Sequence, residues 1–425
     1  MRSQLTIVIA TALLIGACQT TSTLPDVKPG ERPPLATEEA NLWMVMDKAE
    51  ASLKTSGKIE RDPVLKEYVR GIICKLAPEH CSDIRLHIVR TPQFNASMGP
   101  NGSMTVWTGL MLRAQNEAQL AFVIGHEIAH YLRRHSLEKW QSMRNTMDFL
   151  AFVQIATAFA GVAPVGSIGQ LIAQGSLAGY SRDKEREADA YGFRLMTAAG
   201  YDPREAAKIW TALQKEKDAE GEENRSIFFA SHPTSEERAN TIRAEAQKLL
   251  KESGKNVINA ERYRKMTNKF RQAWLADELR AKRFASFRVL LEHQSQNADS
   301  EALLEFFNGE LYRYRDKDGD REGAVEAYEQ AIGAGTPPTE LYRSLGLVLW
   351  DLKDHSKAVE AFTQYLLKAP DADDQEMIMS YINELTMGKN EKTINFYFPN
   401  LCRNCVHAIL PLGTEAHLNW GRVQR

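Results

Sequence analysis

Two histidines and a glutamate in the run His126-Glu127-Ile128-Ala129-His130 have the types and the spacing that metal chemistry requires. Residues four apart share one face of a helix, so the imidazoles of His126 and His130 can meet one metal ion. Ile124 and Ile128 lie about 200° around the same helix, where they can pack in a core. This HExxH pattern is typical of zinc hydrolases, in which the glutamate acts as a general base.

A zinc ion that keeps one coordination position open needs a third protein ligand. His135 follows five residues after His130, but the helical pattern continues through Arg133 and Arg134. We therefore expect His135 to lie on a helix surface and not on the metal.

The segment 183–189, Asp-Lys-Glu-Arg-Glu-Ala-Asp, offers a better source of the third ligand. Glu185 and Asp189 share a helix face, whereas Glu187 points away from it. One of the two carboxylates can bind zinc while the other accepts a hydrogen bond from a ligand imidazole. Spacing alone does not assign these two roles.

The order of these motifs resembles the gluzincin peptidase family that includes the CAAX prenyl protease and HtpX, in its periplasmic BepA-like form. The HExxH run is followed by the ExxAD run at 185–189. Three other stretches match the family: Asn95-Ala96 with residues 102–110, the turn at 200–203, and Ser231-His232-Pro233 with Arg238. The resemblance covers residues 60–245.

The resemblance implies one zinc ion per chain and a role for each site residue. It implies the zinc ligands His126, His130 and Glu185, the general base Glu127, and Asp189 as the carboxylate that orients a ligand. It also implies that His232 can approach the metal and hold the enzyme latent, with Arg238 as a regulatory or transition-state residue. The alternative for His232 is a cap on the turn before a helix.

A strand-like stretch precedes the HExxH helix and resembles the edge strand of the family. This stretch consists of Met104, Thr105, Val106 and Trp107. An edge strand would hold an extended peptide by main-chain hydrogen bonds, which depend on the backbone of the peptide more than on its sequence. The resemblance therefore implies unfolded or misassembled polypeptides as substrates.

The N-terminus is predicted to direct export. The apolar run 5–15 is too short to span a bilayer, so residues 1–17 indicate a signal peptide. The run Leu-Ile-Gly-Ala-Cys that ends at Cys18 resembles the bacterial lipobox, which implies a lipid anchor on this cysteine. By resemblance to lipoprotein sorting, Gln19 directly after the cysteine favours anchoring in the outer membrane, with the protein in the periplasm. The alternative is a cleaved signal with an incidental cysteine.

Proline-rich residues 18–40 predict a flexible tether after the lipidated cysteine. Four more cysteines remain, and an even number in an exported chain suggests disulfides. The simplest pairing joins cysteines that are close in the sequence: Cys74 with Cys81, and Cys402 with Cys405. The last pair could instead form a redox site or half of a zinc site.

The chain has 425 residues, 43% of them hydrophobic and 25% charged, which is typical of a globular protein of two or three domains. With a net charge of -2, the chain has no overall positive electrostatic potential that would attract nucleic acid. Helical patterns dominate, and strand-like stretches occur only at 85–90 and 104–107. We expect a mainly α protein: a zincin-type peptidase domain with a small β-sheet at 41–254, then an α-solenoid.

The expected solenoid spans residues 255–387 and resembles tetratricopeptide repeats. One repeat is marked by Tyr342, Leu345, Gly346, Ala358, Phe362 and Pro370, and the preceding one by Leu311, Ala324 and Tyr328. Residues 388–425 form a C-terminal tail with the CxxC pair. The apolar segment 149–179 is expected to form a helical hairpin beside the cleft, with dipping into the membrane as the alternative.

Two classes of function agree with these patterns. The first is a zinc endopeptidase of the periplasm that degrades misfolded or misassembled envelope proteins. The second is a lipid-anchored chaperone or scaffold with a latent metal site, whose helical repeats bind partners such as the outer-membrane assembly machinery.

Overall fold

The computed structural model describes residues 24–144, 180–221, 232, 236–249, 256–295 and 301–387. The chain divides into two compact units between Gln294 and Ser295. The expected signal peptide, Cys18, the segment 149–179, and the tail with Cys402 and Cys405 lie outside the described residues. Among the residues described, no helix combines the length and apolar character that a membrane span requires.

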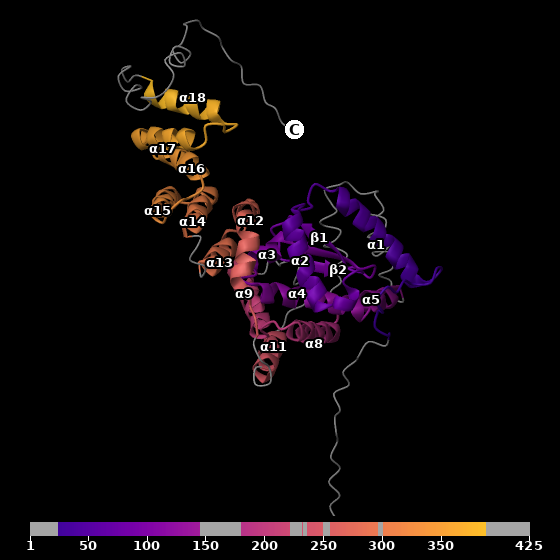
Figure 1. Cartoon of the computed structure of the whole chain (residues 1–425). Coiled ribbons are helices and arrows are strands. Elements are labelled where there is room, and N and C mark those ends of the chain that lie inside the picture. Colours follow the sequence, from indigo (N-terminus) through magenta and orange to yellow (C-terminus); the bar gives the residue numbers. More distant parts are fainter. Residues whose placement is uncertain are drawn as a thin grey trace, which may run out of the picture. The chain divides into compact units, whose positions relative to one another are not determined.

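The first unit is built from helices around one small sheet (Figure 1). Before and within the sheet are α1 (Glu38–Thr55), α2 (Pro63–Leu76), η1 (Pro78–His80), β1 (Arg85–Val89), β2 (Ala96–Met98) and β3 (Ser103–Trp107). After it come α3 (Thr108–Arg113), α4 (Glu117–Leu132), α5 (His135–Arg144), α8 (Arg182–Ala198), α9 (Arg204–Glu220), α11 (Glu236–Leu249), α12 (Ala260–Arg280) and α13 (Phe284–Gln294).

The sheet has the strand order β1-β3-β2, so β3 lies in its centre. Both expected strands are present, as β1 and β3, and β2 is an additional short strand. On β3, Met104 is paired with Leu86 of β1 on one side and with Met98 of β2 on the other. The prediction that residues 104–107 form an edge strand is therefore wrong. The strand is central and is buried at all five positions, including Ser103 and Thr105.

Helix α4 carries the HExxH run and is buried along its whole length. Asn116 caps the start of this helix, because its side chain accepts a hydrogen bond from the backbone N–H of Gln119 at 3.0 Å. Helix α8 crosses α4 where Gly125 faces Gly192. A Cβ on Gly192 would lie 2.7 Å from the backbone nitrogen of His126, so only glycine permits this approach.

The start of the described chain is attached to the end of α4. The backbone N–H of Val27 donates to the Leu132 carbonyl at 3.0 Å. Arg134 donates to the Pro25 carbonyl at 2.9 Å and pairs with Glu31 at 2.6 Å. The prediction of a flexible tether over 18–40 is therefore wrong from residue 24 onward, because the proline-rich pattern does not reveal these partners.

The first unit extends 40 residues beyond the predicted boundary at 254/255, to Gln294. The reason is a buried ion-pair network that ties α12 to the sheet side of the domain. The Arg113 guanidinium of α3 lies 2.8 Å from Glu216 of α9 and 3.0 Å from Glu278 of α12. Charges that are buried this deeply need such partners, so α12 belongs to the first unit.

The second unit, orange to yellow in Figure 1, consists of helical pairs. Its helices are α14 (Glu301–Arg315), α15 (Asp320–Gly333), α16 (Glu340–Asp351), α17 (His355–Lys368) and α18 (Gln375–Thr386). In two successive pairs a glycine on the first helix contacts an aromatic ring on the second. A Cβ on Gly309 would lie 2.4 Å from the Tyr328 ring, and one on Gly346 would lie 2.5 Å from Phe362.

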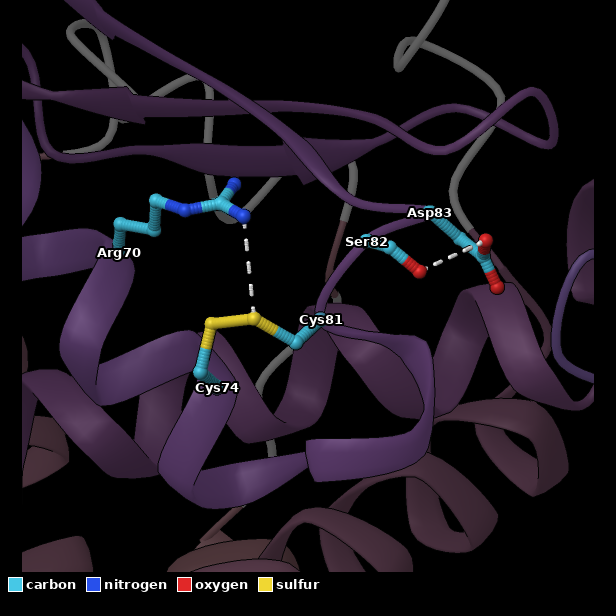
Figure 2. Close-up of a disulfide and its surroundings, with 5 residues drawn as sticks. All are labelled: Arg70, Cys74, Cys81, Ser82 and Asp83. Carbon is cyan, nitrogen blue, oxygen red and sulfur yellow. Dashed lines mark hydrogen bonds between the residues drawn. A yellow bond between two sulfur atoms is a disulfide. The ribbon is translucent and has the colours of Figure 1, made fainter.

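A disulfide joins Cys74, in the last turn of α2, to Cys81, which directly follows η1, with the Cα atoms 4.6 Å apart (Figure 2). The Arg70 guanidinium lies 3.9 Å from the Cys81 sulfur. This bridge closes the turn that leads into β1.

Candidate metal centre

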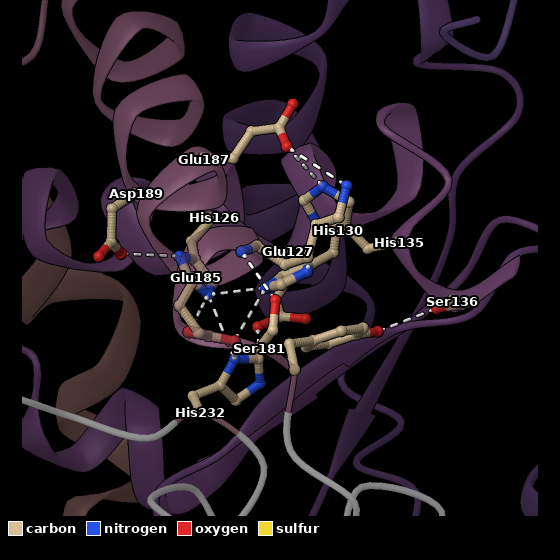
Figure 3. A network of polar contacts seen from close by, with 12 residues as sticks. His126, Glu127, His130, His135, Ser136, Ser181, Glu185, Glu187, Asp189 and His232 are labelled. Atoms are coloured by element: carbon tan, nitrogen blue, oxygen red, sulfur yellow. Dashed lines mark hydrogen bonds and ion pairs between the residues drawn. The ribbon is translucent and has the colours of Figure 1, made fainter. Parts of the chain in front are cut away.

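Four buried side chains from three segments converge on one point (Figure 3). They are His126 and His130 of α4, Glu185 of α8, and His232, and their candidate ligand atoms all lie within 4.8 Å of one another. The Nε2 atoms of the two α4 histidines are 3.0 Å apart. The Glu185 oxygens lie 3.6 Å from His126 Nε2 and 3.5 Å from His130 Nε2.

This set of donors fits a zinc ion. Two imidazole nitrogens and one carboxylate form a ligand set that catalytic zinc sites use. A ligand imidazole must be neutral, and burial holds the pKa of His130 well below its ordinary value. Burial alone would raise the pKa of Glu185, but the neighbouring His232, His130 and His126 hold it well below the ordinary value, so this carboxylate is ionised.

Asp189 lies behind His126, on the side away from the other ligands. Its Oδ1 atom is 3.0 Å from His126 Nδ1, one turn along α8 from Glu185. Arg238 of α11 contacts both carboxylates, with distances of 2.6 Å and 2.8 Å to Asp189 and 2.8 Å to Glu185. The guanidinium therefore fixes the relative positions of a ligand and of the carboxylate that supports another ligand.

Glu127 lies on α4 beside the ligands, but it is not one of the four converging groups. The backbone of Met98 on β2 lies near its carboxylate. Burial raises the pKa of Glu127, although the nearby His232 and His126 oppose this shift. A carboxylate with a raised pKa next to a metal position is suited to accept and return a proton.

His232 occupies the fourth position of the group. Its Nδ1 atom lies 3.1 Å from Glu185 and 3.2 Å from His126 Nε2, and its Nε2 atom lies 3.5 Å from Glu127. Burial lowers the pKa of His232, but Glu185 and Glu127 outweigh burial and raise it. His232 therefore reaches the metal position in this structure.

The prediction that His135 is a surface residue is wrong. Its side chain is fully buried behind His130, with the two Nδ1 atoms 2.9 Å apart. Its Nε2 atom lies 3.3 Å from Glu187, the residue expected to point away from the metal. Helical periodicity does not predict this contact, because the chain turns at Arg134, which has a positive φ of 54°.

Tyr180 is another site residue that the sequence does not reveal. Its ring stacks on the His130 ring with the centroids 4.0 Å apart. Its hydroxyl lies 2.9 Å from the Ser136 hydroxyl, and the Lys139 Nζ atom lies 4.8 Å from the centroid of its ring. These contacts restrict how the His130 ring can turn.

Comparison with known proteins agrees with this geometry. Residues 60–246 match Peptidase family M48, and the match contains all four converging residues and Glu127. The region that matches this family, called the M48 domain below, contains the sheet and helices α2 to α11.

Three relatives illustrate the range of similar proteins. Mitochondrial metalloendopeptidase OMA1 of Schizosaccharomyces pombe is 34% identical over 185 residues, 41% of this chain and 51% of the relative. Metalloprotease YcaL of Escherichia coli is 34% identical over 163 residues, 38% and 61%. A putative beta-barrel assembly-enhancing protease of Vibrio cholerae is 29% identical over 207 residues, 46% and 42%. The chain thus spans about half of the length of these relatives.

Proposed function

We propose that the M48 domain is a zinc-dependent endopeptidase. The observation that carries this proposal is the buried convergence of His126, His130 and Glu185 with Glu127 beside them. Three protein ligands leave a fourth position for water, which is the arrangement of catalytic zinc. The printed names of the relatives support the same activity, since they are metalloendopeptidases and proteases.

The residues of the chain divide the chemistry between them. When bound, zinc lowers the pKa of a coordinated water to about 7 and polarises a carbonyl oxygen. Glu127 takes the proton of the attacking water and transfers it to the leaving nitrogen. Asp189 and Arg238 keep His126 and Glu185 in place during this transfer.

The substrate main chain is proposed to pair with β2, the edge strand next to Glu127. Asn95 and Gly99, which flank β2, bond to β3, so the backbone groups of Ala96 and Met98 point to the opposite edge. The Met98 backbone lies near Glu127. An extended peptide along this edge would therefore place its scissile bond beside the general base.

The proposed substrates are unfolded or misassembled envelope proteins, which supply extended backbone of varied sequence. Relatives from Escherichia coli and Shigella flexneri are named beta-barrel assembly-enhancing proteases, and one from Vibrio cholerae is named a putative one. We place the chain in the periplasm on the same grounds. The lipid anchor at Cys18 and attachment to the outer membrane remain predictions from the sequence.

The second unit is proposed to be a tetratricopeptide-like array. The repeated glycine-to-aromatic contacts at Gly309–Tyr328 and Gly346–Phe362 support this proposal, because they occur at equivalent places in two helical pairs. Stacked pairs form a concave surface that can bind a peptide or a partner. The outer-membrane assembly machinery is the partner that we propose.

His232 supports a latent state of the enzyme. With His232 as a fourth ligand, no coordination position is left for the catalytic water, so this histidine must leave before cleavage. The same observation supports the second candidate function, a chaperone or scaffold that acts through its helical repeats while the metal site stays closed.

One experiment separates these candidates. Zinc content and casein cleavage are measured for the wild type, Glu127→Gln and His232→Ala. The peptidase is supported if all three forms bind zinc, the wild type or His232→Ala cleaves casein, and Glu127→Gln does not. A gain in His232→Ala would support latency. Zinc in every form without cleavage by any of them would favour the chaperone or scaffold.

A further inference from the structure

The two α4 histidines have different supports behind them. His126 Nδ1 faces the Asp189 carboxylate directly, at 3.0 Å. His130 Nδ1 has no carboxylate partner among the described residues, but it lies 2.9 Å from the Nδ1 atom of His135. His135 in turn lies 3.3 Å from Glu187 through its Nε2 atom (Figure 3).

Metal binding would fix the proton positions along this chain of contacts. If His130 binds zinc through Nε2, its proton must be on Nδ1, because a neutral imidazole carries one proton. That N–H can be donated only if Nδ1 of His135 is the acceptor. The proton of His135 is then on Nε2, where it faces Glu187. The distances thus agree with one set of tautomers for all three residues.

We propose that His135 is a positioning residue that connects Glu187 to the zinc ligand His130. This inference rests on the zinc site of the proposed function. The His135 side chain is fully buried, so no solvent competes for its nitrogens. Glu187 is itself fixed by Arg133 at 2.6 Å and by Lys184 at 3.6 Å. The relay therefore extends from the metal position to an ion-paired carboxylate at the surface of α8.

Zinc affinity, measured by competition with a chelator, tests this inference without any substrate. Replacing a group that supports a ligand costs about 10- to 100-fold in metal affinity, and we expect a loss in this range for His135→Phe. His135→Asn should lose less, because its amide oxygen can still accept the His130 N–H. Glu187→Gln replaces a side chain that is 16% exposed, so it tests the relay even if His135→Phe fails to fold.

The matched control is His87→Phe on β1. His87 is also a buried histidine next to a carboxylate, with its Nε2 atom 3.0 Å from Glu50, but it is outside the metal site. We expect this variant to lose stability and to keep the zinc affinity of the wild type. A double-mutant cycle adds a second criterion, because Glu187→Gln should have no further effect on zinc affinity in the His135→Phe background.

Three results would overturn the inference. If the wild type binds zinc and His135→Phe or Glu187→Gln binds it equally well, the relay has no function while the proposed function survives. If the wild type binds no zinc, the relay and the proposed function fail together. If zinc affinity falls as much in His135→Asn as in His135→Phe, the inference is also contradicted, since packing alone would then explain the effect.

Discussion

At the scale of single residues, carboxylates determine much of the chemistry and the stability of the first unit. Glu185 and Asp189 are fixed by one guanidinium, that of Arg238. Sequence alone left open which of the two is the ligand. The structure distinguishes them, because Glu185 approaches both Nε2 atoms whereas Asp189 approaches only the Nδ1 atom of His126.

Glu50 gives a pH-dependent prediction that does not involve the metal site. This buried carboxylate lies 2.5 Å from Arg85 and 3.0 Å from His87; burial would raise its pKa, but these partners and Lys54 lower it from 4.5 to about 2. Because the folded chain has the lower pKa, the ionised group stabilises the fold above pH 4.5 and this contribution disappears as the pH falls toward 2.

We expect Glu50→Gln to lower the free energy of unfolding near neutral pH by about 3 kcal/mol or less. The difference from the wild type should shrink between pH 5 and pH 3. Urea unfolding at several pH values, with chelator present in all samples, measures this. A difference that stays constant over the whole range would show that the ion pairs at Glu50 do not stabilise the fold.

At the scale of elements, the crossing of α4 and α8 brings the ligands together. HExxH and ExxAD are local patterns, so the faces that carry His126, His130 and Glu185 could be predicted from helical periodicity. The contact of His135 with Glu187 could not, because it depends on a turn between α4 and α5. The central position of β3 could not either, since strand order is set by pairing with residues distant in the chain.

Gly192→Ala tests this crossing. The added Cβ would lie 2.7 Å from the His126 nitrogen, so α8 must move away and carry Glu185 with it. We expect a loss of about 2 kcal/mol in the free energy of unfolding and a weaker affinity for zinc, both measured in solution. Gly71→Ala in α2 is the control, because a Cβ there has nothing within 4 Å.

The control should leave zinc affinity unchanged and increase stability by up to about 1 kcal/mol, since alanine favours helix more than glycine does. Equal zinc affinity in both variants would mean that the close approach of the helices is not needed for the site.

At the scale of the whole molecule, the division into units depends on charges that the sequence pattern does not connect. The charged, glycine-containing stretch near residue 255 indicated a boundary, but Glu278 of α12 is completely buried beside Arg113. Removing α12 would leave this guanidinium with Glu216 as its carboxylate partner among the pairs described. The first unit therefore ends with α13.

Two fragments test this division. We expect residues 24–294 to unfold cooperatively and to bind zinc. Residues 24–254 should be less stable by about 3 kcal/mol or more, because a buried ion-pair network is broken. Urea unfolding and limited proteolysis of both fragments provide the comparison. Equal stability would place the boundary back near residue 255.

The spacing of small and aromatic residues predicts helical pairs in the second unit, and several of these residues form contacts within the pairs. Gly346 contacts Phe362 in one pair. In the preceding pair Tyr328 contacts Gly309, a glycine that the repeat pattern did not identify. The longer loop between these helices shifts the glycine relative to the repeat. Local patterns thus predict such pairs well, because each pair contacts mainly its neighbours.

The most direct test of the account is X-ray absorption at the zinc edge, on the wild type and on His232→Ala. We expect a wild-type shell of nitrogen and oxygen ligands at about 2.0–2.2 Å, with three imidazoles. The shell of His232→Ala should contain two imidazoles at the same distances. No bound zinc, a shell with sulfur, or two imidazoles in both forms would contradict the assignment of His126, His130, Glu185 and His232 to one metal centre.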